Sequence, residues 1–295
     1  MKKAVFYIVD VFAEHKYAGN QLAVFMPGHN FSNKVMQQAA REINFSETTF
    51  ILSDKQQKGG YNVRIFTPGE EVPFAGHPTL GTAYIIREKI LRSKQSQLNL
   101  NLKIGQIPVT FESPGKNRNR LWMKQIEPQF NGTLNVTALT EVLNLSESEI
   151  DTQFPIEQVS TGLPFIIVPL KSIDAVKKCQ INKSQYFALI KDIEAKAILV
   201  FAPQTNDPAH QLNVRVFVDY FGIPEDPATG SGNGCLAGYL VKHRYFGKAE
   251  IDIQVEQGYE IGRPSILYLR GKREAGVIQV YVGGQVILVA KGEWI

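Results

Sequence analysis

The chain has 295 residues, of which 44% are hydrophobic and 20% charged, the composition of an ordinary folded protein with room for two domains. Its 32 basic and 28 acidic residues leave a net charge of only +4 and are scattered along the sequence, so we expect no nucleic-acid binding. No apolar run approaches the roughly 20 residues that span a bilayer, so we expect no membrane insertion either. Two cysteines and five dispersed histidines lack the spacing of a disulfide framework or a metal site, and we expect neither a metal nor a cofactor.

The N-terminal segment, MKKAVFYIVDVF, combines two lysines with an apolar stretch, as a signal peptide does. Asp10 interrupts the stretch and no small-residue cleavage site follows, so we predict a first β-strand and a cytoplasmic protein. A second strand, LAVF, follows Gly19-Asn20-Gln21. Ser32 can cap a helix over 33–43, after which the apolar strand ETTFIL begins at Glu47.

An internal repeat organises the rest of the chain. The segment NVRIF at 62–66 recurs as NVRVF at 213–217, and both alternate as strands do. Each is followed by an acidic loop, a small-residue turn and a helical stretch. We align the turn that begins at Ala75 with the turn that begins at Ser231, which places a five-residue shift in the acidic loops, where insertions are tolerated.

Shorter segments extend this repeat. In the second half, Thr161-Gly162-Leu163-Pro164 leads into the strand FIIV, and Asn182 or Ser184 can open a helix. The order of strands and helices predicts an α+β fold with two pseudo-symmetric domains, each a curled mixed β-sheet around a central helix. We place the domains at 1–126 and 127–295, with a last strand at about 284–295 that can return to the first domain.

The two small-residue turns are candidate anion sites. A glycine-rich turn that opens a helix presents unpaired N–H groups beside the positive end of the helix dipole, which favours a carboxylate or phosphate. Each turn could instead serve only to pack a helix against a strand. GSGNG lacks the spacing of a dinucleotide fingerprint. We expect a small acidic metabolite to bind in a cleft between the halves, with these candidate residues: Asn20, Gly76, Gly230, Gly232 and Asn233.

Acid–base candidates lie beside the same turns. A helix start would keep His77 neutral, although a lone histidine is more often structural. Asp226 precedes the second turn and could equally cap a loop. Ser231 lacks a GxSxG context and is not expected to be a hydrolase nucleophile. Glu47 stands at a strand entry, where a charge usually faces solvent. Among the remaining charged residues, we interpret these as exposed loop acids or structural arginines: Glu70, Glu71, Arg64 and Arg215.

Four segments, GNQLAVF, NFSETTF, IFTPGEEVPFAGHPTLGTA and EDPATGSGNGCLAGYL, resemble the PhzF family, named for phenazine biosynthesis. The family belongs to the diaminopimelate-epimerase-like fold, and the resemblance covers essentially the whole chain. It implies two pseudo-symmetric domains with the active site between them, an isomerase without a cofactor, and a homodimer. Related epimerases and racemases use two cysteines, one at each helix start. Ala75 and Ser231, aligned here with those positions, supply no thiolate, and Cys235 is expected to be a small buried residue.

The resemblance also implies residue roles. The glutamate of NFSE, a proton shuttle in PhzF-type isomerases, corresponds to Glu47, and the other motifs add His77, Asp226 and Ser231. The family's best-known reaction isomerises trans-2,3-dihydro-3-hydroxyanthranilate. On that pattern Glu47 moves a proton between ring carbons, Asp226 holds or protonates the amine, and His77 and Ser231 position Glu47 and the substrate carboxylate. Two alternatives are a non-catalytic metabolite-binding protein and an amino-acid epimerase or racemase.

Overall fold

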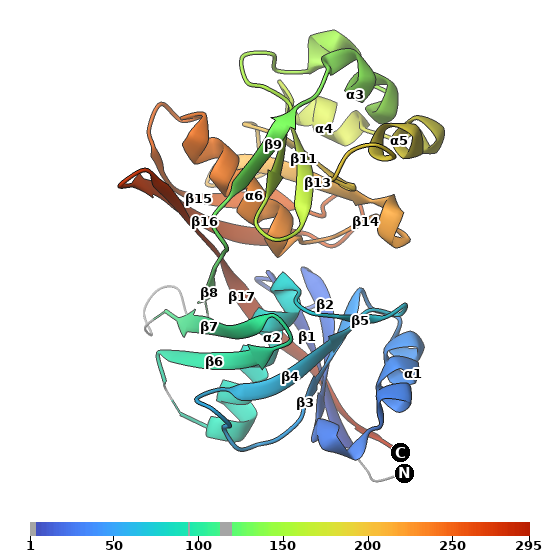
Figure 1. The fold of residues 1–295 in the computed structure, drawn as a ribbon, viewed down its shortest axis with the longest axis vertical. Coiled ribbons are helices and arrows are strands. Elements are labelled where there is room, and N and C mark those ends of the chain that lie inside the picture. The colour runs from blue at the N-terminus through green and yellow to red at the C-terminus, as the bar shows by residue number, and fades with distance from the viewer. Residues whose placement is uncertain (1–3, 94, 113–119) are drawn as a thin grey trace. The chain divides into compact units, whose positions relative to one another are not determined.

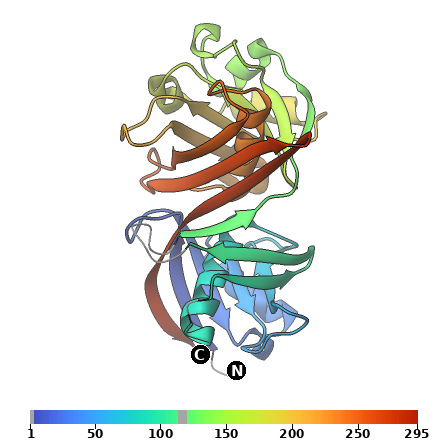
Figure 2. The same ribbon diagram turned by 90° about the vertical axis from the view of Figure 1, so that its left-hand side faces the viewer.

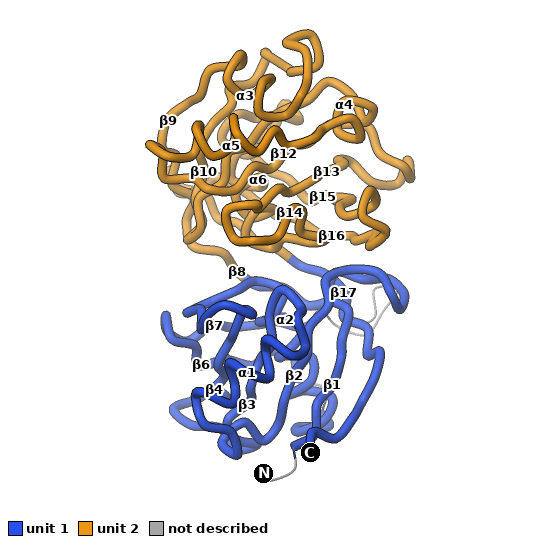
Figure 3. The backbone as a smooth tube through the Cα atoms, turned by 90° about the vertical axis from the view of Figure 1, so that its right-hand side faces the viewer, with its two compact units in different colours: residues 1–123, 283–295 blue, residues 124–282 orange. Residues whose placement is uncertain are grey.

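The computed structural model describes residues 4–93, 95–112 and 120–295. Contacts between Cα atoms divide the chain into two compact units, shown in Figure 3: unit 1 comprises residues 1–123 and 283–295, and unit 2 residues 124–282. Both units mix helices with strands, as an α/β protein does. Within the described part of the chain, no helix has the length and apolarity needed to cross a membrane.

Unit 1 is a ring of strands around one helix. Its helices and strands are β1 (Ala4–Val11), β2 (Asn20–Met26), η1 (Gly28–Asn30), α1 (Asn33–Ile43), β3 (Glu47–Ile51), β4 (Tyr61–Phe66), β5 (Glu71–Val72), α2 (Gly76–Ile85), η2 (Ile86–Leu91), β6 (Gln97–Leu102), β7 (Gly105–Phe111), β8 (Arg120–Lys124) and the later part of β17 (Val277–Trp294). Pairing runs from β1 through β2, β3, β4, β6 and β7 to β8, and β17 pairs with both β8 and β1. The ring therefore closes.

Helix α2 lies inside the ring and α1 outside it (Figure 1). Buried residues, mostly small or apolar, occur on every face of α2, as is typical of a helix inside a core. The helix contacts β1, β2, β3, β6 and β7. Gly81 makes this approach possible, because a Cβ there would come within 2.6 Å of the Leu22 side chain. The amphipathic α1 covers an aromatic cluster that contains Phe25 and Phe50. The predicted cap is confirmed, since the Ser32 hydroxyl accepts the N–H of Val35 at 3.3 Å.

Unit 2 repeats this order. Its helices and strands are β9 (Gln129–Thr133), α3 (Val136–Leu143), η3 (Glu147–Glu149), β10 (Glu157–Ser160), β11 (Pro164–Pro169), α4 (Ile173–Lys178), α5 (Lys183–Ile190), β12 (Ala197–Ala202), β13 (Leu212–Val218), η4 (Asp219–Phe221), β14 (Ile223–Glu225), α6 (Gly230–Lys242), β15 (Glu250–Gln257), β16 (Ser265–Glu274) and the first residues of β17. Strands β10 to β16 pair in the same sequence and directions as β1 to β7, and α6 packs against β10, β11, β15 and β16. Strand β17 contributes to both units (Figure 2).

The two arginines of the repeated strands make the same ion pair. Arg64 forms two hydrogen bonds of 2.8 Å with Glu71, and Arg215 binds Glu225 at 3.0 and 2.8 Å. Each glutamate lies opposite the phenylalanine that ends the repeated motif. The structural role predicted for both arginines is confirmed. Glu71 is not the exposed loop acid predicted from the sequence, because this bidentate pair holds it against the sheet.

These pairs correct the register of the repeat. Counting from Glu71 and Glu225, the sequence EVPFAGH aligns with EDPATGS without a gap. Ala75 then matches Thr229, and both are the N-caps of their helices, so His77 matches Ser231. The match of Ala75 with Ser231 was wrong by two positions, and the shift between the repeats is three residues rather than five. The alignment had matched Gly76 with Gly232, whereas Gly76 and Gly230 are the residues that begin the two helices.

Candidate active site

Three predicted residues gather at one edge of unit 1. The parallel strands β2 and β3 begin at Asn20 and Glu47, with Leu22 directly opposite Glu47. His77 is the second residue of α2 and forms a hydrogen bond with the backbone of Gln21. The starts of two strands and of the central helix therefore meet, and Gly76 lies in the same first helical turn.

The carboxylate of Glu47 and the ring of His77 are in contact. The distance between Glu47 Oε2 and His77 Nε2 is 3.4 Å, slightly longer than an ordinary hydrogen bond. The Glu47 side chain is 18% exposed and that of His77 only 6%. A bound molecule could therefore reach Glu47, while His77 supports it from the interior.

Burial sets the charge of His77. Loss of solvent lowers the pKa of His77 from 6.5 to about 3, and the hydrogen bond with the backbone of Gln21 opposes this effect only in part. The ring is neutral at physiological pH, as predicted. Its contact with Glu47 therefore joins a carboxylate to a neutral imidazole and is not an ion pair.

A second group of predicted residues lies at the start of α6 in unit 2. Asp226 directly follows β14, and its Oδ2 atom accepts a hydrogen bond of 2.5 Å from the hydroxyl of Thr229. Ser231 is the second residue of α6 and is partly exposed, as Asp226 is. Gly230 and Gly232 are buried in the same turn, and a Cβ on Gly232 would lie 3.0 Å from the ring of Phe165.

The side chain of Asn233 faces the interior of unit 2. It is fully buried, and its amide nitrogen donates to the carbonyl of Thr229 at 3.1 Å and to Gln257 Oε1 at 2.8 Å. Thr79, at the same helical position in α2, donates its hydroxyl to the carbonyl of Ala75 at 2.8 Å. These contacts stabilise the two helix starts, and a contact between Asn233 and substrate stays a prediction.

Neither cysteine offers a thiolate. Cys179 and Cys235 are both buried, and burial raises the pKa of each thiol to about 12. The expectation that Cys235 is a small buried residue is confirmed. The positions at the helix starts that the corrected register brings together, His77 and Ser231, also carry no thiol. Among the described residues, no cluster of three or more histidines, cysteines and acids could hold a metal ion.

Sequence reasoning missed Thr229 and Gln257. Both are buried, and both bond to Asp226 or to the turn beside it. A signal was available, because aligning Glu71 with Glu225 places Asp226 and Thr229 at the positions of Val72 and Ala75. Gln257 carries no motif of its own, since its partners lie far back in the sequence. The two groups of residues belong to different units, and the single cleft predicted from the sequence stays a prediction.

Comparison with known proteins shows the family. The family model described as phenazine biosynthesis-like protein, PhzC-PhzF, matches residues 9–292. The chain belongs to the PhzF family. A trans-2,3-dihydro-3-hydroxyanthranilate isomerase of Pseudomonas aeruginosa is 34% identical over 90% of this chain and 90% of its own length. A Pasteurella multocida protein named only as an isomerase is 33% identical over 98% of this chain and 93% of its own.

Solved structures agree with this assignment. A phenazine biosynthesis protein of the PhzF family from Bacillus anthracis has a TM-score of 0.92 and 27% identity, with all of both chains covered. A hydroxyproline epimerase from Agrobacterium vitis, with a TM-score of 0.61 over 99% of this chain and 92% of its own, is 10% identical and shares the fold alone. With relatives named as isomerases matching nearly the full length, this PhzF-family protein is an isomerase.

Proposed function

We propose that this protein isomerises a small cyclic acid by moving a proton with Glu47 as the acid–base group and without a cofactor. The observation that carries the proposal is the contact between Glu47 and the neutral, buried His77. A neutral ring can orient the carboxylate without forming an ion pair that would hold it in its charged form. Glu47 can thus both accept and return a proton.

The proposal assigns substrate binding to the remaining predicted residues. The resemblance to the PhzF family supports Asp226 as the group that meets the substrate amine and Ser231 as a donor to its carboxylate. The first turns of α2 and α6, with Gly76, Gly230 and Gly232, would add backbone N–H groups. In this proposal the two units are the pseudo-symmetric domains of the diaminopimelate-epimerase-like fold and bind one substrate.

The relatives named for trans-2,3-dihydro-3-hydroxyanthranilate make that compound the first substrate to test. An amino-acid racemase with two thiols is disfavoured, because both cysteines are buried and keep their protons at neutral pH. We also propose a cytoplasmic homodimer, which light scattering coupled to size-exclusion chromatography and cell fractionation would test.

The direct test replaces Glu47 with glutamine. Glu47→Gln keeps the size of the side chain but removes its acid–base function, so turnover should fall by about 10²–10⁴-fold. Turnover and deuterium uptake from D₂O can be followed together by proton NMR, which also shows which carbon exchanges.

Glu42→Gln, on the exposed face of α1, is the matched control and should keep full activity. If Glu47→Gln turned over substrate at the wild-type rate, Glu47 would not be the proton carrier. Tight binding of the compound by the wild-type protein without exchange at any carbon would instead favour a non-catalytic binding protein.

A further inference from the structure

A polar network holds the start of α6, and the equivalent place in unit 1 has none. In the corrected register Asp226 corresponds to Val72 and Thr229 to Ala75. The equivalent of the third member, Gln257, is found from strand pairing. The repeated motifs begin at Asn213 and Asn62, which lie opposite Glu256 and Asn101. Gln257 therefore corresponds to Leu102. Three apolar residues of unit 1 thus correspond to three polar residues of unit 2.

Gln257 is fully buried and makes four hydrogen bonds. Its Oε1 atom accepts from the backbone N–H of Thr229 at 3.2 Å and from the amide of Asn233 at 2.8 Å. Its Nε2 atom donates to the carbonyl of Asp226 at 2.8 Å and to the hydroxyl of Thr229 at 3.0 Å. A backbone N–H can only donate and a carbonyl can only accept, so these partners fix the orientation of the amide.

This orientation determines where the Thr229 proton points. The Thr229 hydroxyl accepts a hydrogen bond from Gln257 Nε2, and its own single proton is then donated to Oδ2 of Asp226, 2.5 Å away. A hydrogen bond donated to a carboxyl group favours its charged form. The chain from Gln257 through Thr229 therefore holds Asp226 as an oriented carboxylate.

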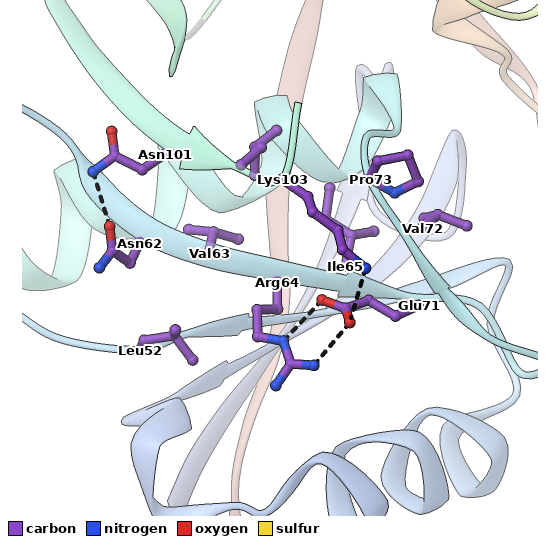
Figure 4. Close-up of a pocket in the computed structure, with 11 residues that line it drawn as sticks. Leu52, Asn62, Val63, Arg64, Ile65, Glu71, Val72, Pro73, Asn101 and Lys103 are labelled. Carbon is purple, nitrogen blue, oxygen red and sulfur yellow. Dashed lines mark hydrogen bonds and ion pairs between the residues drawn. The ribbon is translucent and has the colours of Figure 1, made fainter. Parts of the chain in front are cut away.

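Unit 1 shows that a helix start in this fold does not need the network. Helix α2 begins at the same position after the same arginine–glutamate pair, yet Val72, Ala75 and Leu102 offer no polar side chain. Val72 and Leu102 instead line a cavity of about 350 Å³ next to Glu71, shown in Figure 4. A buried polar side chain lowers stability unless it is hydrogen-bonded, and Gln257 finds its partners in the turn from Asp226 to Thr229 and in Asn233. The network in unit 2 leads to Asp226, a carboxyl group with no counterpart in unit 1.

We propose that Gln257 and Thr229 are positioning residues that keep Asp226 charged and oriented to bind a protonated amine. This inference rests on the proposed function, which assigns Asp226 to the substrate amine, and adds the two residues that hold that carboxylate in place. It also separates the two roles left open for Asp226, because a carboxylate held by a donated hydrogen bond binds an ammonium group and does not protonate it.

The test compares two ligands that differ only in that group: trans-2-aminocyclohexanecarboxylate and trans-2-hydroxycyclohexanecarboxylate. Isothermal titration calorimetry should show at least tenfold tighter binding of the amino acid by the wild-type protein. Thr229→Val removes the donor, and Gln257→Leu inserts the residue found at the equivalent position of unit 1. Each variant should lose most of this preference, with an affinity for the amino acid lowered about 10- to 100-fold.

Thr229→Ser keeps the hydroxyl but loses the methyl group, and should retain the preference for the amino acid. If Thr229 acted only by packing, the serine variant would lose the preference and the valine variant would keep it. Thermal unfolding identifies any variant that fails to fold. If one of Thr229→Val and Gln257→Leu does not fold, the ligand preference of the other tests the inference. Equal binding of both ligands by the wild-type protein, or an undiminished preference in a folded Thr229→Val or Gln257→Leu, would overturn the inference. A failure of the isomerase proposal is seen separately, as a wild-type protein that selects the amine but shows neither turnover nor hydrogen exchange.

Discussion

His77 is a histidine that the fold keeps from taking up a proton. In the unfolded chain it becomes charged as the pH falls through about 6.5, whereas burial lowers the pKa of the folded residue to about 3. Between these values the unfolded state binds more protons than the folded state. The free energy of unfolding therefore falls as the solution is acidified from pH 6.5 towards pH 3, and the contribution of His77 is intact only above that window.

Replacing His77 tests this reasoning. In His77→Gln the free energy of unfolding should depend less steeply on pH between 6 and 4, by up to about 1.4 kcal/mol per pH unit. Urea titrations at several pH values measure the slope, and the exposed His15→Gln is the control. Parallel curves for His77→Gln and the wild-type protein would mean that the folded His77 already binds a proton at these pH values.

Residues whose role depends on distant partners were the hardest to predict. The neutral state of His77 was predicted from the helix start, whereas the structure attributes it to burial, which depends on strands distant in the sequence. Glu47 was singled out only through its resemblance to a family motif, since nothing in its neighbours distinguishes a catalytic carboxylate from a solvent-facing one. Thr229 and Gln257 were missed because the contacts that define them join segments close only in the folded chain.

At the scale of single elements, the hairpin between β16 and β17 contains an unfavourable residue. Ala275 and Gly276 form its turn with φ angles of 50° and 85°. Both angles lie in the left-handed region, as in the type I′ turn that matches the twist of a hairpin. Glycine adopts this conformation readily, whereas alanine does so at a cost of about 1 kcal/mol.

Asparagine tolerates the left-handed region well, so Ala275→Asn should stabilise the hairpin. We expect the free energy of unfolding to rise by about 0.5–1 kcal/mol, measured by chemical denaturation. Ala275→Val places a β-branched side chain at the same angles and should lower it. A higher free energy of unfolding for Ala275→Val than for Ala275→Asn would contradict the turn geometry.

Helix caps were predicted well because capping is a local interaction. Ser32 and Asn182, both proposed as caps from the sequence, accept backbone N–H groups at the starts of α1 and α5. The repeat was also visible, because NVRIF and NVRVF both form strands that carry the same ion pair. Its register was not, since the glycines that suggested the alignment occur at different positions relative to the two N-caps. The register was established by the strand pairs and not by sequence similarity.

At the scale of the molecule, unit 1 depends on the C-terminal strand. Strand β17 pairs with β1 and β8, so its removal would open the ring and expose two strand edges. Trp294 also packs its ring against Phe6 and Phe25, with centroid distances of 6.0 and 5.1 Å. A chain that ends at residue 282 should therefore lose the structure of unit 1.

Calorimetry and limited proteolysis would measure this effect. In the chain ending at residue 282, segments of unit 1 should be cleaved rapidly and the unfolding enthalpy should decrease. Deletion of Ile295 alone, a residue that is 83% exposed, should change neither property. Full protease resistance of unit 1 in the shorter chain would show that its ring is stable without β17.

The shared strand also affects how the protein folds during synthesis. Unit 2 is continuous in sequence, but the first 123 residues of unit 1 leave the ribosome long before the segment that completes their sheet. At about 5–20 residues per second, the intervening unit 2 takes roughly 10 to 30 s to make. For that time the nascent β1 and β8 each lack one of their two neighbouring strands, β17. We expect the hydrophobic side chains around α2 to remain accessible to chaperones until β17 is made. Unit 1 is thus begun before unit 2 but completed only after it.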